Sequence, residues 1–329
     1  MPKTNDVIGL GNALMDFLIE VEDQKLLELN LKKGEMHLVE EDKAKEMLSK
    51  IEKQQLKLEM VPGGSAANTL KGIAFLGGKS ILCGKVGRDK EGMMYVEQME
   101  KCGVVSRIKN HPSKITGHAL TFITPDAQRT FSVHLGAALH LAKEEILEED
   151  ISDSKILHLE GYQLEGETKE TVLEAMELAR KHETLISLDL ADPGVIRRNK
   201  KLVQKIVQNY VDILFVNEKE AKEFTDKEAE EAVIELSKYV KIAVVKIGAE
   251  GSIIGEENGI HYIAPFPAKA IDTTGAGDTY AAGFLYGYCC GWPLEKAGRL
   301  GSLLASKVVE QKGVKLNHLD PKELKRRVE

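Results

Sequence analysis

The sequence predicts an α/β protein with a mostly parallel central sheet, helices on both faces of that sheet, and a small separate β-sheet. Short apolar segments alternate with charged segments of helical spacing through most of the 329 residues. Such alternation is typical of βαβ units, whose right-handed crossovers cover both faces of a parallel sheet with helices. Two segments interrupt this alternation and predict the small sheet.

The elements of the large domain follow from local patterns. Strands are expected at the apolar runs 6–10, 80–83, 155–160, 185–190, 211–216 and 242–247. Helices are expected over 65–76, which Gly77-Gly78 ends, and over 167–182, where the apolar residues recur at helical spacing. Asn258-Gly259 between two apolar segments predicts a hairpin. Since ligands of such sheets bind beyond the carboxyl ends of the strands, functional residues are expected in the loops that follow them.

The small sheet is expected from four short segments. Residues 17–21 and 36–39 have the composition of strands but lie too close together for a crossover, and 115–124 and 129–135 flank a Pro-Asp turn. We assign 12–38 and 114–135 to a β lid, and 1–11, 39–113 and 136–329 to the large α/β domain. A lid over a substrate is the functional interpretation, and an ordinary edge hairpin explains the same residues.

Composition and charge narrow the class of protein. The chain is 43% hydrophobic and 29% charged, with a net charge of −7, which argues against a nucleic acid or an anionic membrane as the main partner. No apolar run is long enough to span a bilayer, and the first residues lack the pattern of a signal peptide. The four cysteines lack metal-ligand spacing. We expect a cytoplasmic protein.

The most informative segment is Asp-Thr-Thr-Gly-Ala-Gly-Asp at 272–278, which opens an apolar run. Gly275, Ala276 and Gly277 are small enough for their backbone N–H groups to close on a ligand, and a helix N-terminus favours an anion there. Asp278 would repel a resting phosphate, so it needs a second purpose, such as orienting and deprotonating a hydroxyl. For a lone aspartate, capping the helix is the simpler interpretation.

Two other glycine turns precede candidate binding residues. The segment 9–14 lacks the third glycine of a dinucleotide-binding fingerprint, so it disfavours a nicotinamide-dependent oxidoreductase and instead delivers Asn12 and Asp16 beyond a strand. Gly63-Gly64 opens the helix at 65–76, and Asn68 can both donate and accept hydrogen bonds, as a vicinal diol requires. The structural alternatives are a satisfied turn carboxylate for Asp16 and a tight helix–sheet contact for the glycines.

These motifs resemble those of the ribokinase/PfkB family of small-molecule kinases. Residues 272–278 match its C-terminal signature Asp-Thr-x-Gly-Ala-Gly-Asp at every fixed position, and 63–69 resembles its N-terminal signature. Residues 217–220 resemble its Asn-x-x-Glu motif and 246–251 its nucleotide-side loop, in the expected order. The resemblance implies a ribokinase-like three-layer α/β/α domain with a β lid, and a Mg²⁺- and ATP-dependent phosphotransferase.

The resemblance also implies roles for individual residues. Asp278 would be the catalytic base, and the Gly275–Gly277 amides would form the anion hole. The residues that would bind the substrate are Asn12, Asp16, Gly63, Gly64 and Asn68, with Arg129 of the lid folding over the transferring phosphates. The residues that would lie on the ATP side are Asn217, Lys246, Gly248 and Gly251.

Two cation sites are implied as well. Glu220 would organise Mg²⁺ through water, since oxygen ligands and retained water suit this ion. A helix capping box formed by Asn217 and Glu220 explains the same two residues without a metal. Backbone carbonyls near Asp272 and Thr274 would hold a monovalent cation such as K⁺.

The acceptor is expected from two shorter similarities. Residues 11–16 and 129–137 resemble the adenosine-kinase branch of the family, which implies transfer to the 5′-hydroxyl of a nucleoside, adenosine first. A sugar kinase of the ribokinase or fructokinase type is the close alternative. From another class, a non-catalytic ligand-binding regulator is disfavoured because Asp278 and the whole anion-hole loop are retained. Partners are expected to be small molecules, and both a monomer and a homodimer stay open.

Overall fold

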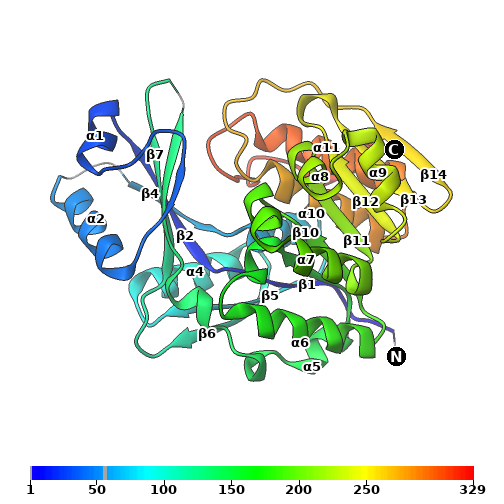
Figure 1. Cartoon of the computed structure of the whole chain (residues 1–329), viewed down its shortest axis with the longest axis horizontal. Coiled ribbons are helices and arrows are strands. Elements are labelled where there is room, and N and C mark those ends of the chain that lie inside the picture. Colours follow the sequence, from blue (N-terminus) through cyan, green and yellow to red (C-terminus); the bar gives the residue numbers. More distant parts are fainter. Residues whose placement is uncertain (1, 55–57, 127) are drawn as a thin grey trace.

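The computed structural model describes residues 2–54, 58–126 and 128–329, and these form two β-sheets (Figure 1). The larger sheet has the order β14-β13-β12-β11-β10-β9-β1-β5-β6. Its strands pair in parallel except at β12–β13 and β13–β14. Their bounds are β1 (Asn5–Leu10), β5 (Ser80–Gly87), β6 (Val105–His111), β9 (Ser154–Glu160), β10 (Leu185–Asp189), β11 (Ile213–Asn217), β12 (Ile242–Lys246), β13 (Ser252–Glu256) and β14 (Gly259–Ile263).

Helices cover both faces of this sheet because its strands are apolar on both sides. Successive side chains of a strand point to opposite faces, so Val7 belongs to one buried cluster and Ile8 to the other. The first cluster includes residues of α3 (Ser65–Phe75), α4 (Lys90–Lys101), α10 (Ala276–Cys289), α11 (Leu294–Val308) and α12 (Pro321–Arg326). The second includes residues of α5 (Glu148–Ser152), α6 (Thr168–Lys181), α7 (Pro193–Tyr210), α8 (Glu218–Thr225) and α9 (Ala229–Leu236).

The small sheet has the order β3-β8-β7-β2-β4 and carries two helices on one face (Figure 1). Its elements are β2 (Leu14–Glu20), α1 (Asp23–Glu28), β3 (Met36–Leu38), α2 (Glu41–Lys53), β4 (Leu58–Gly63), β7 (Gly117–Ile123) and β8 (Arg129–His134). Met15, Phe17 and Ile19 of β2 are buried in one cluster with Leu26 of α1 and Met47 of α2. The two helices therefore cover the face of the sheet to which the odd-numbered residues of β2 point.

Most expected elements are present. The helix at 65–76, the helix at 167–182 and all the expected parallel strands are present. Their bounds agree with the predicted ones within two residues, except that β5 continues to Gly87, four residues beyond its predicted end. Both predicted hairpins form as antiparallel pairs, β7 with β8 and β13 with β14. The parallel alternation thus fixed the three-layer architecture correctly, since long βαβ patterns are the strongest local signals.

Two expectations about the small sheet need correction. Residues 39–113 are predicted to belong to the large domain, but within that range β4 pairs with β2 in the small sheet and α2 packs against the same sheet. The strand predicted at 17–21 begins earlier, at Leu14, so Asp16 lies within β2 and not in the turn that precedes it. The reason for the first error is that β4 contains Pro62 and mixed polar residues. A proline is tolerated because β4 is an edge strand, but it hides the strand in the sequence.

The two sheets meet at the carboxyl edge of the larger one. The chain passes between them where β1 leads into β2 and where β4 leads into α3. It returns from β8 into a 3₁₀ turn at Gly136–His140. Within the described ranges, no helix is both long and apolar enough to cross a bilayer.

Candidate active site

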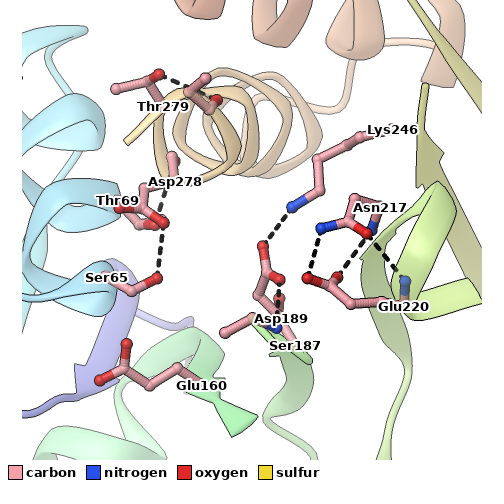
Figure 2. A network of polar contacts seen from close by, with 12 residues as sticks. Ser65, Thr69, Glu160, Ser187, Asp189, Asn217, Glu220, Lys246, Asp278 and Thr279 are labelled. Atoms are coloured by element: carbon pink, nitrogen blue, oxygen red, sulfur yellow. Dashed lines mark hydrogen bonds and ion pairs between the residues drawn. The ribbon is translucent and has the colours of Figure 1, made fainter. Parts of the chain in front are cut away.

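Polar side chains gather where the parallel strands of the large sheet end (Figure 2). Glu160, Asp189, Asn217 and Lys246 are the last residues of β9, β10, β11 and β12, and Asn12 follows β1. The carboxyl ends of parallel strands share one edge, so residues far apart in the sequence meet there. The N-termini of α3 and α10 face the same edge and complete the site.

The loop at 272–278 forms the expected helix N-terminus. α10 begins at Ala276, and Gly275 precedes it in the left-handed region with a φ of 73°. A Cβ at Gly275 would collide with the Val314 side chain, so glycine is required for both reasons. Among the described residues no side-chain hydrogen bond caps this helix, while the Ala276 N–H donates to the Thr273 carbonyl at 3.2 Å. The positive end of α10 therefore faces the site.

Asp278 is held by the first turns of α3. Its Oδ1 accepts a hydrogen bond from Ser65 Oγ at 2.6 Å, and its Oδ2 accepts one from Asn68 Nδ2 at 2.9 Å. Thr69 Oγ1 donates to the Asp278 carbonyl at 3.1 Å. Burial raises the pKa of Asp278, and the hydrogen bonds from Ser65 and Asn68 partly oppose that rise. The result is an oriented carboxylate that is more basic than an exposed aspartate.

Lys246 lies between the loop at 272–278 and two carboxylates, those of Asp189 and Glu220. Its Nζ contacts Asp189 Oδ2 at 2.6 Å, and a Cβ placed on Gly277 would lie 3.0 Å from the same Nζ. Burial disfavours the charged form, but Asp189 and Glu220 outweigh it and keep the pKa of Lys246 above its ordinary value. The ammonium therefore stays protonated beside the N-terminus of α10, where it adds to the attraction for an anion.

Asn217 and Glu220 form the capping box that was the alternative to a metal role. Glu220 Oε2 accepts the Asn217 N–H at 2.8 Å, Glu220 Oε1 accepts Asn217 Nδ2 at 2.6 Å, and Asn217 Oδ1 accepts the Glu220 N–H at 2.9 Å. Burial and the nearby Asp189 raise the pKa of Glu220 to about 7. Two carboxylates thus share a region with one ammonium, which leaves an excess of acidic groups.

Asp16 and Asn12 lie against the two glycines that precede α3. A Cβ on Gly63 would collide with the Asp16 carboxylate, and a Cβ on Gly64 would collide with the Asn12 carbonyl oxygen. The side-chain Oδ1 of Asn12 is buried and has no hydrogen-bond partner among the described residues. Because buried polar atoms in proteins are nearly always bonded, this oxygen is suited to accept a hydrogen bond from a ligand hydroxyl.

The other predicted site residues are Arg129, Gly248, Gly251, Asp272 and Thr274. Arg129 begins β8, and its side chain lies outside the described part of the structure. Gly248 and Gly251 lie in the turn after β12, where a Cβ on Gly251 would collide with the Ile263 carbonyl. Asp272 accepts hydrogen bonds from the N–H groups of Thr274 at 2.9 Å and Gly313 at 2.6 Å. Its carboxylate therefore ties the loop to the segment near Gly313.

Three residues of this network were missed from the sequence: Ser65, Glu160 and Asp189. Glu160 is 1% exposed, and its two carboxylate oxygens accept the N–H groups of Asn12 at 3.1 Å and Ala66 at 3.2 Å. Burial raises the pKa of Glu160 to about 7. The available signal was a lone acidic residue closing an apolar strand, a pattern that also occurs where a strand simply reaches solvent.

The motif resemblance implies that Glu220 binds Mg²⁺ through water molecules and not directly, and the side chains around Glu220 are compatible with such binding. No group of three or more His, Cys, Asp and Glu side chains within the described ranges could hold a metal by itself. Mg²⁺ commonly keeps several waters and binds through one or two carboxylates together with substrate phosphates. The buried Glu220, with its raised pKa and an acidic neighbour, suits a cation held through water.

Comparison with known proteins identifies the family to which this site belongs. Residues 29–320 match the pfkB family carbohydrate kinases. The chain belongs to the PfkB family. The 5-dehydro-2-deoxygluconokinase of Geobacillus thermodenitrificans is 30% identical over 264 residues, covering 75% of this chain and 78% of that protein. The adenosine kinase of Saccharomyces cerevisiae is 26% identical over 333 residues, covering 94% and 96%.

A solved structure of similar fold supports the assignment of this chain to the PfkB family. The adenosine kinase from Sinorhizobium meliloti superposes with a TM-score of 0.89 and 30% identity, covering 99% of both chains. The fold is therefore ribokinase-like, as the motifs implied. The relatives are phosphotransferases that act on hydroxyl groups, and this kinase is one as well. Since nucleoside and sugar kinases match at similar identity, the comparisons leave the acceptor to be argued from the site.

Proposed function

We propose that this PfkB kinase transfers the γ-phosphate of ATP to the 5′-hydroxyl of a nucleoside, with adenosine as the preferred acceptor. The observation that supports a nucleoside over a free sugar is an apolar surface on the small sheet, on the same face as Asp16. A ribose held by Asp16 alone would leave this surface uncovered, whereas a nucleoside would bring a purine base to it.

The register of the strands defines this Asp16 face. Paired residues of neighbouring strands point to the same side, and Asp16 pairs with Val61 of β4 and Ala119 of β7. Further pairs extend the face across β8 and β3. Its apolar members are Leu14, Leu18, Met36, Leu38, Val61, Ala119, Ile123, Phe131 and Val133. Met36 and Leu38 are 51% and 67% exposed, so the outer part of the face is accessible to a ligand.

The Asp16 face is turned towards the anion-hole loop, because the segment 312–315 connects the two. Lys312 pairs with Glu20 at 2.5 Å and Lys315 with Glu59 at 2.6 Å, and both glutamates lie on the Asp16 face. Gly313 of the same segment donates to Asp272. A base on the apolar part of the face and a ribose at Asp16, Asn12 and Asn68 would direct the 5′-hydroxyl towards Asp278.

In the proposed mechanism, residues of this chain position the acceptor hydroxyl and stabilise the charge that develops on the transferring phosphoryl group. Ser65 and Asn68 orient the Asp278 carboxylate, which accepts the proton of the acceptor hydroxyl as the phosphoryl group is transferred. Phosphoryl transfer passes through a loose transition state, so stabilisation of charge on the transferring oxygens dominates. The amides at the N-terminus of α10 and the Lys246 ammonium supply it.

Two cations belong to the proposal. Mg²⁺, organised through water by Glu220, would neutralise charge on the ATP phosphates. A monovalent cation such as K⁺ would be held near the carbonyls of Asp272 and Thr274, beside the N-terminus of α10. ATP itself would approach from the side of Asn217, Lys246 and the turn at Gly248–Gly251.

A comparison of acceptors tests the proposed function. ATP consumption would be measured with adenosine, inosine, guanosine, ribose and fructose at equal Mg²⁺-ATP. We expect kcat/KM for adenosine to exceed that for ribose by at least about 10-fold, because only the nucleoside covers the Asp16 face. A higher value for ribose or fructose would instead establish the sugar-kinase alternative that the 5-dehydro-2-deoxygluconokinase relative favours.

Replacing Glu220 with Gln is expected to raise the Mg²⁺ concentration for half-maximal rate by about 10-fold, because a neutral amide attracts the hydrated ion less. The KM for the acceptor should stay unchanged, since Glu220 lies on the ATP side. Mg²⁺ titrations of the rate would be compared with those of Glu223→Gln, which lies on the same helix but pairs with Arg197 at the surface. Equal Mg²⁺ requirements in both variants would contradict the role of Glu220.

A further inference from the structure

The Glu160 carboxylate joins two separate segments at the point where the chain crosses between the sheets. One oxygen accepts the N–H of Asn12, in the crossing from β1 to β2, and the other accepts the N–H of Ala66, at the start of α3. The side chain is 1% exposed, so these two bonds are not shared with bulk water. A buried carboxylate needs such donors, and bonds to an ionised acceptor are stronger than neutral ones.

Both segments carry residues proposed to hold the acceptor. Asn12, whose Oδ1 has no hydrogen-bond partner in the described part of the chain, is on the first segment, and β2 leads on from there to Asp16. Ser65 and Asn68, which orient Asp278, are on the second. The distance between the two segments therefore decides whether the acceptor's ring hydroxyls and its reacting hydroxyl can be bound at the same time.

Polar and acidic groups surround Glu160, and among the described residues no basic side chain forms a hydrogen bond or an ion pair with its carboxylate. Burial and Asp278 raise its pKa to about 7, while the N–H groups of Asn12 and Ala66 and the Ser65 hydroxyl lower it. Figure 2 shows Ser65 between Glu160 and Asp278. The positive end of α3 supplies the compensation that a basic side chain would give elsewhere.

We propose that Glu160 is a positioning residue of the acceptor site, which sets the spacing between the Asn12 turn and the N-terminus of α3. This inference rests on the proposed acceptor site. Glu160 does not touch the reacting atoms; it acts through the backbone of Asn12 and Ala66. Its loss should therefore weaken acceptor binding without weakening the binding of ATP, which lies on the other side of Asp278.

The test is the kinetics of Glu160→Gln. Glutamine has one acceptor oxygen and presents an N–H₂ group to the second backbone N–H, so one bond is lost and two donors oppose each other. We expect the KM for the acceptor to rise by about 10-fold, the value of one bond to a charged group, with the KM for ATP unchanged. Glu160→Asp, which keeps the charge but is too short to reach both amides, should show the same selective rise.

A second measurement does not depend on the acceptor. Hydrogen–deuterium exchange should be faster in Glu160→Gln in peptides covering 8–16 and 62–70. Asp150→Asn is the matched control, because Asp150 is also a buried carboxylate but pairs with Arg107 away from the site. It should lower the melting temperature without changing either KM or the exchange of these two segments.

The outcomes separate this inference from the proposed function. A selective rise in acceptor KM with faster exchange supports the positioning role. An unchanged acceptor KM in both Glu160 variants overturns it, even if exchange is faster, since Glu160 would then be a structural tie only. If the wild type phosphorylates none of the acceptors, the proposed function fails; unchanged exchange in 8–16 and 62–70 would then also overturn the inference about Glu160.

Discussion

Replacing Asp278 with Asn is expected to lower kcat by at least about 10²-fold, because the variant loses the group that receives the acceptor's proton. The fold should survive, since asparagine has the same shape and its oxygen can still accept the hydrogen bond from Ser65. Asn68 can turn its own amide oxygen towards the new N–H₂ group. Acceptor binding is therefore expected to change little, and the loss should fall on kcat.

Steady-state kinetics and thermal unfolding of the variant would be measured together. Asp212→Asn is a suitable control, because Asp212 precedes β11 at the opposite edge of the sheet and bonds the Ile186 N–H there. That variant should keep full turnover. Near-normal kcat in Asp278→Asn would contradict the assignment of Asp278 as the base. A large loss of stability would show that the lower kcat comes from unfolding and not from the loss of the base.

The second large effect is expected from Gly64→Ala. Gly64 has a φ of 94°, which L-residues rarely adopt, and an added Cβ would collide with the carbonyl oxygen of Asn12. The strain alone costs about 1–3 kcal/mol of the free energy of unfolding. The collision also pushes the Asn12 turn away from α3. We expect kcat/KM for the acceptor to fall by about 10²-fold or more, because a shift of about 1 Å in a bound substrate can cost that much in rate.

Gly77→Ala provides a matched control for this backbone strain. Gly77 has a φ of 93°, nearly that of Gly64, but a Cβ there would meet nothing within 4 Å. It ends α3 at the far side of the helix from the site. Gly77→Ala should lose stability from its positive φ alone, whereas Gly64→Ala should lose at least as much stability and should also lose activity. Equal loss of activity in the two would show that strain, rather than displacement of Asn12, is responsible.

The parts of the fold that could be predicted are those with strong local patterns. The alternating strands and helices gave the large sheet, and the motif residues Asn217, Lys246 and Asp278 were brought together because the ends of parallel strands share one edge. β4 could not be predicted, since its proline and polar residues suit an edge strand only once its neighbour β2 is known.

The residues missed from the sequence, Asp189 and Glu160, form contacts with segments that are far away along the chain, and the sequence does not show which segments become neighbours. Asp189 meets Lys246 across 57 positions of the chain, and Glu160 meets Asn12 across 148. Each is a single acidic residue at the end of an apolar strand, which by itself indicates only where the strand stops. Their partners follow from the order of β1, β9, β10, β11 and β12 in the sheet, and that order is a property of the folded chain.

The most direct test of the central claim is to identify the product formed from Mg²⁺-ATP and adenosine, with 5′-deoxyadenosine as the comparison. The two nucleosides present the same base and ring hydroxyls to the Asp16 face, but only adenosine has the hydroxyl that Asp278 would deprotonate. We predict that adenosine gives adenosine 5′-monophosphate, whereas 5′-deoxyadenosine competes with it and is not phosphorylated. No phosphorylation of adenosine, or a phosphorylated product from 5′-deoxyadenosine, would contradict transfer to the 5′-hydroxyl at this site.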